Sequence, residues 1–137
     1  MYQYLIVAAT AASPIGELVI AIPVGLALEL SPIWVALTAI VFNMLPVLVI
    51  SSVFSRAEGS QGPLRWLTRF RKDRVARVVG RYGLPGILVL TPLLGAWAVT
   101  ATLEAVGVSR MRILGTMLLS LLVYSAILLG GNQLFFG

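Results

Sequence analysis

Long runs without a charged residue constrain the fold of this chain more than any other feature. Two of them, 33–55 and 113–135, have the length of a membrane-spanning helix, because about 20 apolar residues at 1.5 Å each cross a hydrocarbon core of about 30 Å. Only 11% of the 137 residues are charged, against about 25% in soluble domains. The sequence therefore predicts one all-α integral membrane domain over residues 1–137.

The basic residues indicate the orientation of this domain. The net charge of +5 is concentrated in the connector 56–81, and lysine and arginine next to membrane spans mark the cytoplasmic side. Arg110 and Arg112 are the other two basic residues. We therefore expect a multi-pass protein of the cell (inner or plasma) membrane, with the connector and Arg110–Arg112 on the cytoplasmic side.

Within the connector, the stretch 62–83 predicts a helix lying on the membrane surface. Leu64, Leu67 and Phe70 form an apolar stripe opposite the arginines, which is typical of helices that bind anionic lipid headgroups. The helix either only fixes the orientation or also gathers an anionic substrate. The candidate lipid contacts are Arg69, Arg71, Lys72, Arg74, Arg77 and Arg81.

The uncharged segment 82–103 is long enough to cross the membrane, but a crossing would place Arg110 and Arg112 outside. The segment also contains "TPLLG" at 91–95, where Pro92 removes a helix hydrogen bond. A re-entrant helical hairpin that enters and leaves on the cytoplasmic side satisfies both observations. A kinked full span is the alternative.

The N-terminal run raises the same problem. Residues 2–13 and 15–30 are each short for a span, and together they form one overlong helix with four expected breaks, at Pro14, Gly16, Pro23 and Gly25. A second re-entrant hairpin fits better. A single long span would reverse the side of the N-terminus.

The two halves of the chain then have the same order of expected elements. Residues 1–55 give a hairpin, Glu29 and a full span, and residues 82–137 give a hairpin, Glu104 and a full span. One span carries the chain inward and the other carries it back, so the halves have opposite orientations. Broken helices of inverted repeats form substrate sites near the midplane. We therefore expect two inverted repeats joined by the basic connector, with a site between the two hairpins.

The chain contains no cysteine and no histidine, which excludes disulfides, cysteine nucleophiles and sites of thiolate or imidazole metal ligands. Its one aspartate, Asp73, lies in the connector, so no hydrolytic group of residues can be assembled. We expect no enzymatic activity, metal, cofactor or nucleic-acid partner.

Glu17 is the strongest candidate for transport chemistry. It follows a Pro-x-Gly break and precedes an apolar run, and a carboxylate inside a membrane is a functional candidate by default. Removal from water disfavours its charged form, which would let it take up and release a proton. The alternative is that Glu17 caps the second arm of the hairpin, where the helix dipole stabilises an acid.

Other polar residues in the apolar runs allow two interpretations each. Glu29 and Glu104 either take part in transport or end their hairpins at the membrane interface, with Glu104 paired to Arg110 or Arg112. Asn43 lines a path or forms a hydrogen bond between helices. Trp97 faces a cavity or anchors at the interface.

These residues belong to stretches that resemble the family of small multidrug export proteins. The stretches are "GELVIAIPVGLAL", "FNMLPVLVI" and "RYGLPGILVLTPLLGAWAVTATLEAVGVSR". The family shows a Glu followed by Ile-Pro-x-Gly, an Asn-x-x-Pro in the next span, and Pro-x-x-Gly-x-Trp near the second hairpin. The matching residues here are Glu17, Pro23, Gly25, Asn43, Pro92, Gly95 and Trp97. The resemblance covers nearly the whole chain and implies little about substrate.

The plan is more distantly similar to the DedA (VTT-domain) superfamily, which includes lipid-phosphate translocases and scramblases. Its members carry two re-entrant hairpins, with an acid and a proline–glycine pair in the first and arginines in the second. Glu17, Pro23 and Gly25 match the first pattern loosely. The second hairpin departs from it, since the arginine nearest to "TPLLG" is Arg81.

We therefore expect a membrane transporter, or a translocase of lipids or small molecules, with Glu17 as the proton-coupled acid. Two spans and two hairpins are few to enclose a path, so we also expect a homodimer. The alternative is a membrane scaffold or interaction protein that transports nothing.

Overall fold

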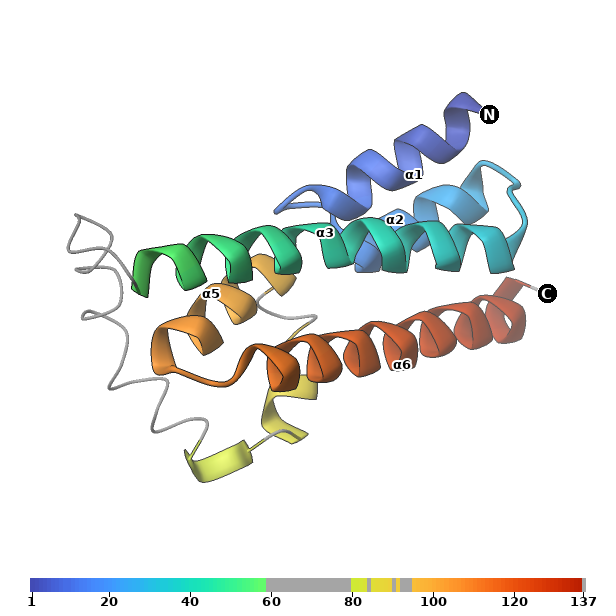
Figure 1. The fold of residues 1–137 in the computed structure, drawn as a ribbon. Coiled ribbons are helices and arrows are strands. Elements are labelled where there is room, and N and C mark those ends of the chain that lie inside the picture. The colour runs from blue at the N-terminus through green and yellow to red at the C-terminus, as the bar shows by residue number, and fades with distance from the viewer. Residues whose placement is uncertain (59–79, 84, 90, 92–94, 137) are drawn as a thin grey trace. The chain divides into compact units, whose positions relative to one another are not determined.

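The computed structural model describes residues 1–58, 80–83, 85–89, 91 and 95–136 (Figure 1), and every regular element in these residues is a helix. The named helices are α1 (Tyr2–Ala12), α2 (Glu17–Ala27), α3 (Pro32–Glu58), α5 (Ala96–Val106) and α6 (Arg110–Phe136). They form two compact units. Unit 1 comprises Met1–Pro46 and Leu118–Gly137, and unit 2 comprises Val47–Met117.

In unit 1, α1 and α2 form a helical hairpin and pack side by side (Figure 1). The Ser13 side chain closes the turn, because its Oγ donates to the Thr10 carbonyl at 2.9 Å and accepts from the Gly16 N–H at 2.8 Å. A Cβ at position 16 would lie 2.5 Å from the Thr10 carbonyl oxygen, so the turn requires glycine there. The break predicted at Pro14 and Gly16 is therefore present.

The breaks expected at Pro23 and Gly25 are absent, because α2 continues through both residues. Proline in a helix interior removes one hydrogen bond, but its neighbours Ala21 and Ile22 are fully buried in the core of unit 1. Their packing holds the helix through the proline. The prediction of an interruption at this point was wrong.

The core of unit 1 joins all four of its helices. It contains Val7 of α1, Leu18 of α2, Val35 of α3 and Leu121 of α6. At Gly25 the helices approach closely, because an added Cβ would lie 2.5 Å from Val35 Cγ1. Gly25 therefore serves close helix packing.

Unit 2 combines the end of α3, the short helical stretches 80–83 and 85–89, α5 and the start of α6. Gly95 has a φ of +86° and precedes α5, so a helix interruption is present in "TPLLG". Pro92 of this motif lies outside the described residues. Buried apolar side chains from four of these elements form the interior, including Val47, Ile87, Leu103 and Ile113.

Two helices are long and apolar enough to cross a membrane, over Pro32–Arg56 and Arg110–Phe135. At 1.5 Å per residue, the 27 residues of α3 and of α6 each extend about 40 Å. Both helices expose large apolar side chains, among them Trp34, Leu37, Val41, Leu122 and Ile127. Such exposure fits contact with lipid.

The amphipathic helix predicted for 62–83 lies almost entirely outside the described residues, as do the lipid-contact candidates Arg69, Arg71, Lys72, Arg74 and Arg77. Arg81 is described and exposed. Its guanidinium lies 6.0 Å from the centre of the Tyr82 ring, within the range of a cation–π contact.

Candidate functional site

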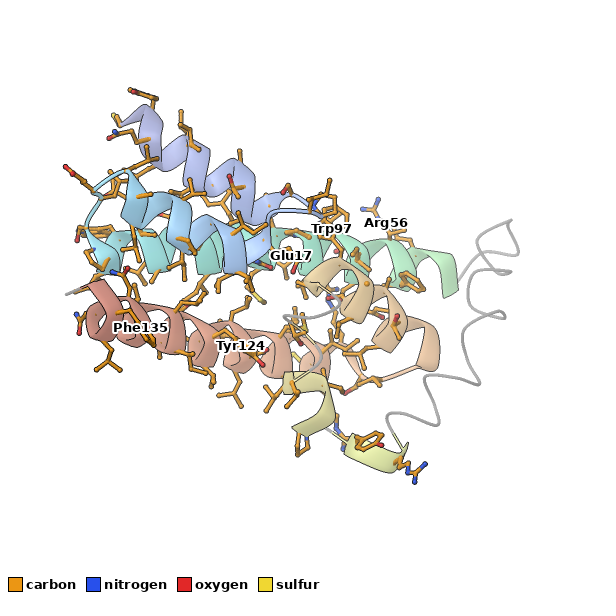
Figure 2. All side chains as sticks on the ribbon, turned by 180° about the vertical axis from the view of Figure 1, so that it is seen from behind. Glu17, Arg56, Trp97, Tyr124 and Phe135 are labelled. Carbon is orange, nitrogen blue, oxygen red and sulfur yellow. The ribbon has the colours of Figure 1, made fainter. Side chains whose placement is uncertain are left out.

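Glu17 is the first residue of α2 and is buried, with 8% of its surface exposed. Figure 2 shows its side chain at the start of this helix. Leu18, the next residue, belongs to the apolar core of unit 1. The structure thus combines the two positions that the sequence suggests for Glu17, the first turn of a helix and a buried environment.

The backbone at Glu17 is strained. Its φ is +45°, in the left-handed region that residues with a side chain adopt at a cost of roughly 1–2 kcal/mol. Such strain persists where the surrounding structure enforces it, and it is frequent at functional sites. Glu17 thus combines burial, a strained backbone and the first position of a helix.

Asn43 lies on α3 in unit 1 with 1% of its surface exposed. Within the described part of the chain, neither Oδ1 nor Nδ2 of its side chain has a hydrogen-bond partner. A buried polar group without a partner costs about 1–3 kcal/mol. The hydrogen bond between helices that the sequence suggests is not formed among these residues.

Pro23 and Gly25 have different surroundings in α2. Pro23 is exposed, whereas Gly25 is buried against Val35 and Val7. Of the two residues, Pro23 is therefore the one accessible to a ligand.

In unit 2, one face of α5 carries polar groups. Trp97, Thr100 and Glu104 are spaced by three and four residues, which places them on the same side of the helix. Figure 2 shows Trp97 near the start of α5. Thr100 is fully buried and Glu104 is 9% exposed. Among the described residues, Thr100 Oγ1 and Glu104 Oε1 have no hydrogen-bond partner.

Arg110, one of the two partners that the sequence suggests for Glu104, contacts a residue of α3. The Arg110 guanidinium donates to Ser52 Oγ at 3.2 Å, and Arg56 lines a small cavity of about 320 Å³ together with Ser52. These residues lie at the end of α3 and the start of α6. The basic ends of both long helices are thus close together in unit 2.

The candidate residues therefore divide between the units. Unit 1 holds Glu17, Pro23, Gly25 and Asn43, and unit 2 holds Gly95, Trp97 and Glu104. Sequence reasoning did not select Ser51 or Ser125, whose buried hydroxyls have no hydrogen-bond partner among the described residues. Their spacing offered no signal, because serine is frequent in membrane helices and often bonds its own backbone.

Residues 17–127 match the protein family described as "Putative small multi-drug export protein". The chain belongs to this family. The match includes α2, α3, α5 and most of α6, and thus all the candidate residues above. With the two apolar helices of spanning length, it identifies a membrane protein of an export family.

No match was found among curated proteins or among solved structures. The distant similarity to the DedA superfamily stays a prediction from the sequence.

Proposed function

We propose that this export-family protein is a membrane transporter or translocase that moves an amphiphilic molecule across the cell membrane, coupled to protons. The observation that carries the proposal is the set of buried polar side chains in otherwise apolar helices. Asn43, Thr100 and Glu104 have side-chain atoms with no hydrogen-bond partner among the described residues. In a bilayer each such group costs several kcal/mol unless water, a ligand or another protein group pairs with it. A transport path supplies water or substrate at these positions.

Glu17 is the group we propose for proton coupling. It is the acid of α2 that lies next to the apolar core of unit 1, and it is held in a strained backbone conformation. Burial of a carboxyl favours its neutral form, whereas contact with water favours the charged form. If Glu17 alternates between a buried environment and contact with water, it would therefore bind and release one proton.

The hairpin of α1 and α2 supports a re-entrant arrangement in the membrane. Each arm has 11 residues and extends about 16 Å, about half of a hydrocarbon core of about 30 Å. An arm of this length enters the membrane without crossing it. We propose that the N-terminus and the start of α3 lie on the same side.

The composition of the units supports an inverted repeat. Unit 1 contains the first hairpin, residues 32–46 of α3 and residues 118–136 of α6, and unit 2 contains α5, residues 47–58 of α3 and residues 110–117 of α6. Each unit thus pairs the start of one long helix with the end of the other. Three further parts of the proposal rest on the sequence. They are the path between two hairpins, the homodimer and the cytoplasmic location of the connector.

Reconstitution in liposomes tests the proposal. Flux of ethidium, an organic cation, and flipping of a fluorescent phosphatidylglycerol would be followed with and without an imposed pH gradient. We expect one of the two probes to cross faster than in protein-free liposomes, with a rate that depends on the gradient. Rates equal to those of protein-free liposomes for both probes would favour the scaffold interpretation.

A further inference from the structure

Unit 1 contains a cavity of about 850 Å³. Its wall is formed by the second half of α2, the loop to α3 and the last turns of α6, where Figure 2 labels Phe135. The volume lies within the range of about 300–1,000 Å³ that is usual for small-molecule sites. Most residues of the wall are apolar, and Pro23 is among them.

Glu29 gives this cavity its charge. Of the residues in its wall, all of which are described, Glu29 is the one with an ionisable side chain, and Asn132 is the other polar residue. The wall contains no basic residue, so it offers an anion no opposite charge. An apolar space beside a carboxylate is complementary to an organic cation with an apolar body.

The backbone shows that a glutamate is unfavourable at this position. The Glu29 N–H donates to the Leu26 carbonyl at 3.0 Å, and the Leu30 N–H donates to the Gly25 carbonyl at 3.2 Å. This is the Schellman pattern, whose left-handed position is usually occupied by glycine. Glu29 occupies it with a φ of +57°.

The charge is unfavourable as well, because the C-terminal end of a helix carries a partial negative charge and favours cations. Glu29 therefore departs from two local preferences at once. Such departures are expected where a side chain serves function rather than stability, and a carboxylate in the wall of a cavity supplies that function.

We propose that this cavity binds an amphiphilic organic cation, with its apolar body between α2 and α6 and its positive charge at Glu29. As a statement about the transported substrate, the inference rests on the function proposed above. As a statement about binding, it stands on the cavity and its single carboxylate.

Two probes of nearly equal size and shape and opposite charge test the role of charge. Binding of tetraphenylphosphonium and of tetraphenylborate to the purified full-length protein in detergent would be measured by equilibrium dialysis. We expect tetraphenylphosphonium to bind at least tenfold more tightly. Glu29→Gln should weaken its binding about tenfold, whereas Glu58→Gln, at the end of α3 in unit 2, should leave it unchanged.

Leucine substitutions at two adjacent glycines test whether the cation binds in this cavity. Gly131 lies in the cavity wall and Gly130 does not, and a Cβ added to either meets no atom within 4 Å. Both leucine variants should therefore fold. We expect the side chain of Gly131→Leu to occupy part of the cavity and weaken tetraphenylphosphonium binding at least fivefold, and Gly130→Leu to bind like the wild type.

Equal binding of the two probes, or an unchanged affinity in Glu29→Gln or Gly131→Leu, would overturn the inference. The outcomes also distinguish the inference about binding from the proposed transport function. Charge-selective binding that depends on Glu29, without flux of any probe, would retain the site and reject the transporter. Flux without such binding would retain the transporter and reject the site.

Discussion

At the scale of single residues, the two acids that flank α2 are the most informative. Glu17 and Glu29 are the non-glycine residues with positive φ among the described part of the chain. The sequence identified both as acids in an apolar run and assigned each a structural alternative, a helix cap for Glu17 and the membrane interface for Glu29. Local sequence does not reveal that a residue occupies a left-handed position, because the helix end depends on which residues pack in the core.

The strain at Glu29 predicts a stabilising substitution. Glu29→Gly should raise the free energy of unfolding by about 1 kcal/mol, because glycine adopts positive φ without steric cost. Leu28→Gly is the matched control, since Leu28 has a φ of −83° and gains nothing from glycine. Thermal unfolding in detergent would compare them. A melting temperature of Glu29→Gly below that of the wild type would contradict the left-handed conformation.

A second prediction compares alanine substitutions at Gly25 and at Gly115. Gly25→Ala should destabilise the protein by about 1–3 kcal/mol, because its Cβ would overlap with Val35. Gly115→Ala on α6 meets no atom within 4 Å and should be neutral or stabilising by up to about 1 kcal/mol, since alanine favours helix. Chemical unfolding would measure both, and equal stabilities would show that Gly25 is not a packing position.

At the scale of elements, the uncharged runs and their interruptions predicted the helices well. The α1–α2 turn lies at Pro14 and Gly16, and α3 and α6 match the expected spans at 33–55 and 113–135. The prediction failed at Pro23, where the helix continues. A proline indicates a lost hydrogen bond, but the buried neighbours that hold the helix together are visible only in three dimensions.

Accessibility of introduced thiols tests the hairpin of α1 and α2, since the chain has no cysteine of its own. Ser13→Cys, Ser31→Cys and Ser109→Cys would be labelled in intact cells with a reagent that does not cross membranes. We expect labelling of Ser31→Cys from outside, of Ser109→Cys only after permeabilisation, and slow labelling of Ser13→Cys at the hairpin turn. Efficient labelling of Ser13→Cys after permeabilisation, and not before, would show that residues 2–13 cross the membrane.

At the scale of the whole molecule, family membership and helix composition agree on a membrane protein of an export family. The sequence could not predict which polar side chains are buried without a partner among the described residues, because helical periodicity is weak where nearly every residue is apolar. Asn43 was recognisable as a polar exception in an apolar run. Ser51 and Ser125 were not.

Oligomeric state is a further prediction at this scale. We propose a homodimer, because two spans and the two proposed hairpins would leave polar groups that a second copy would cover. The measurement is the mass of the protein in lipid nanodiscs, at several ratios of protein to nanodisc. A mass of one chain per nanodisc at every ratio would contradict a homodimer.

Proton movement in liposomes tests the central claim most directly. Wild type, Glu17→Gln and the control Glu58→Gln would be reconstituted with a pH-sensitive dye inside, and the internal pH followed after addition of ethidium. The account predicts an ethidium-dependent pH change for the wild type and Glu58→Gln, and a loss of at least tenfold in rate for Glu17→Gln. An unchanged rate in Glu17→Gln would contradict the role of this buried acid in proton-coupled transport.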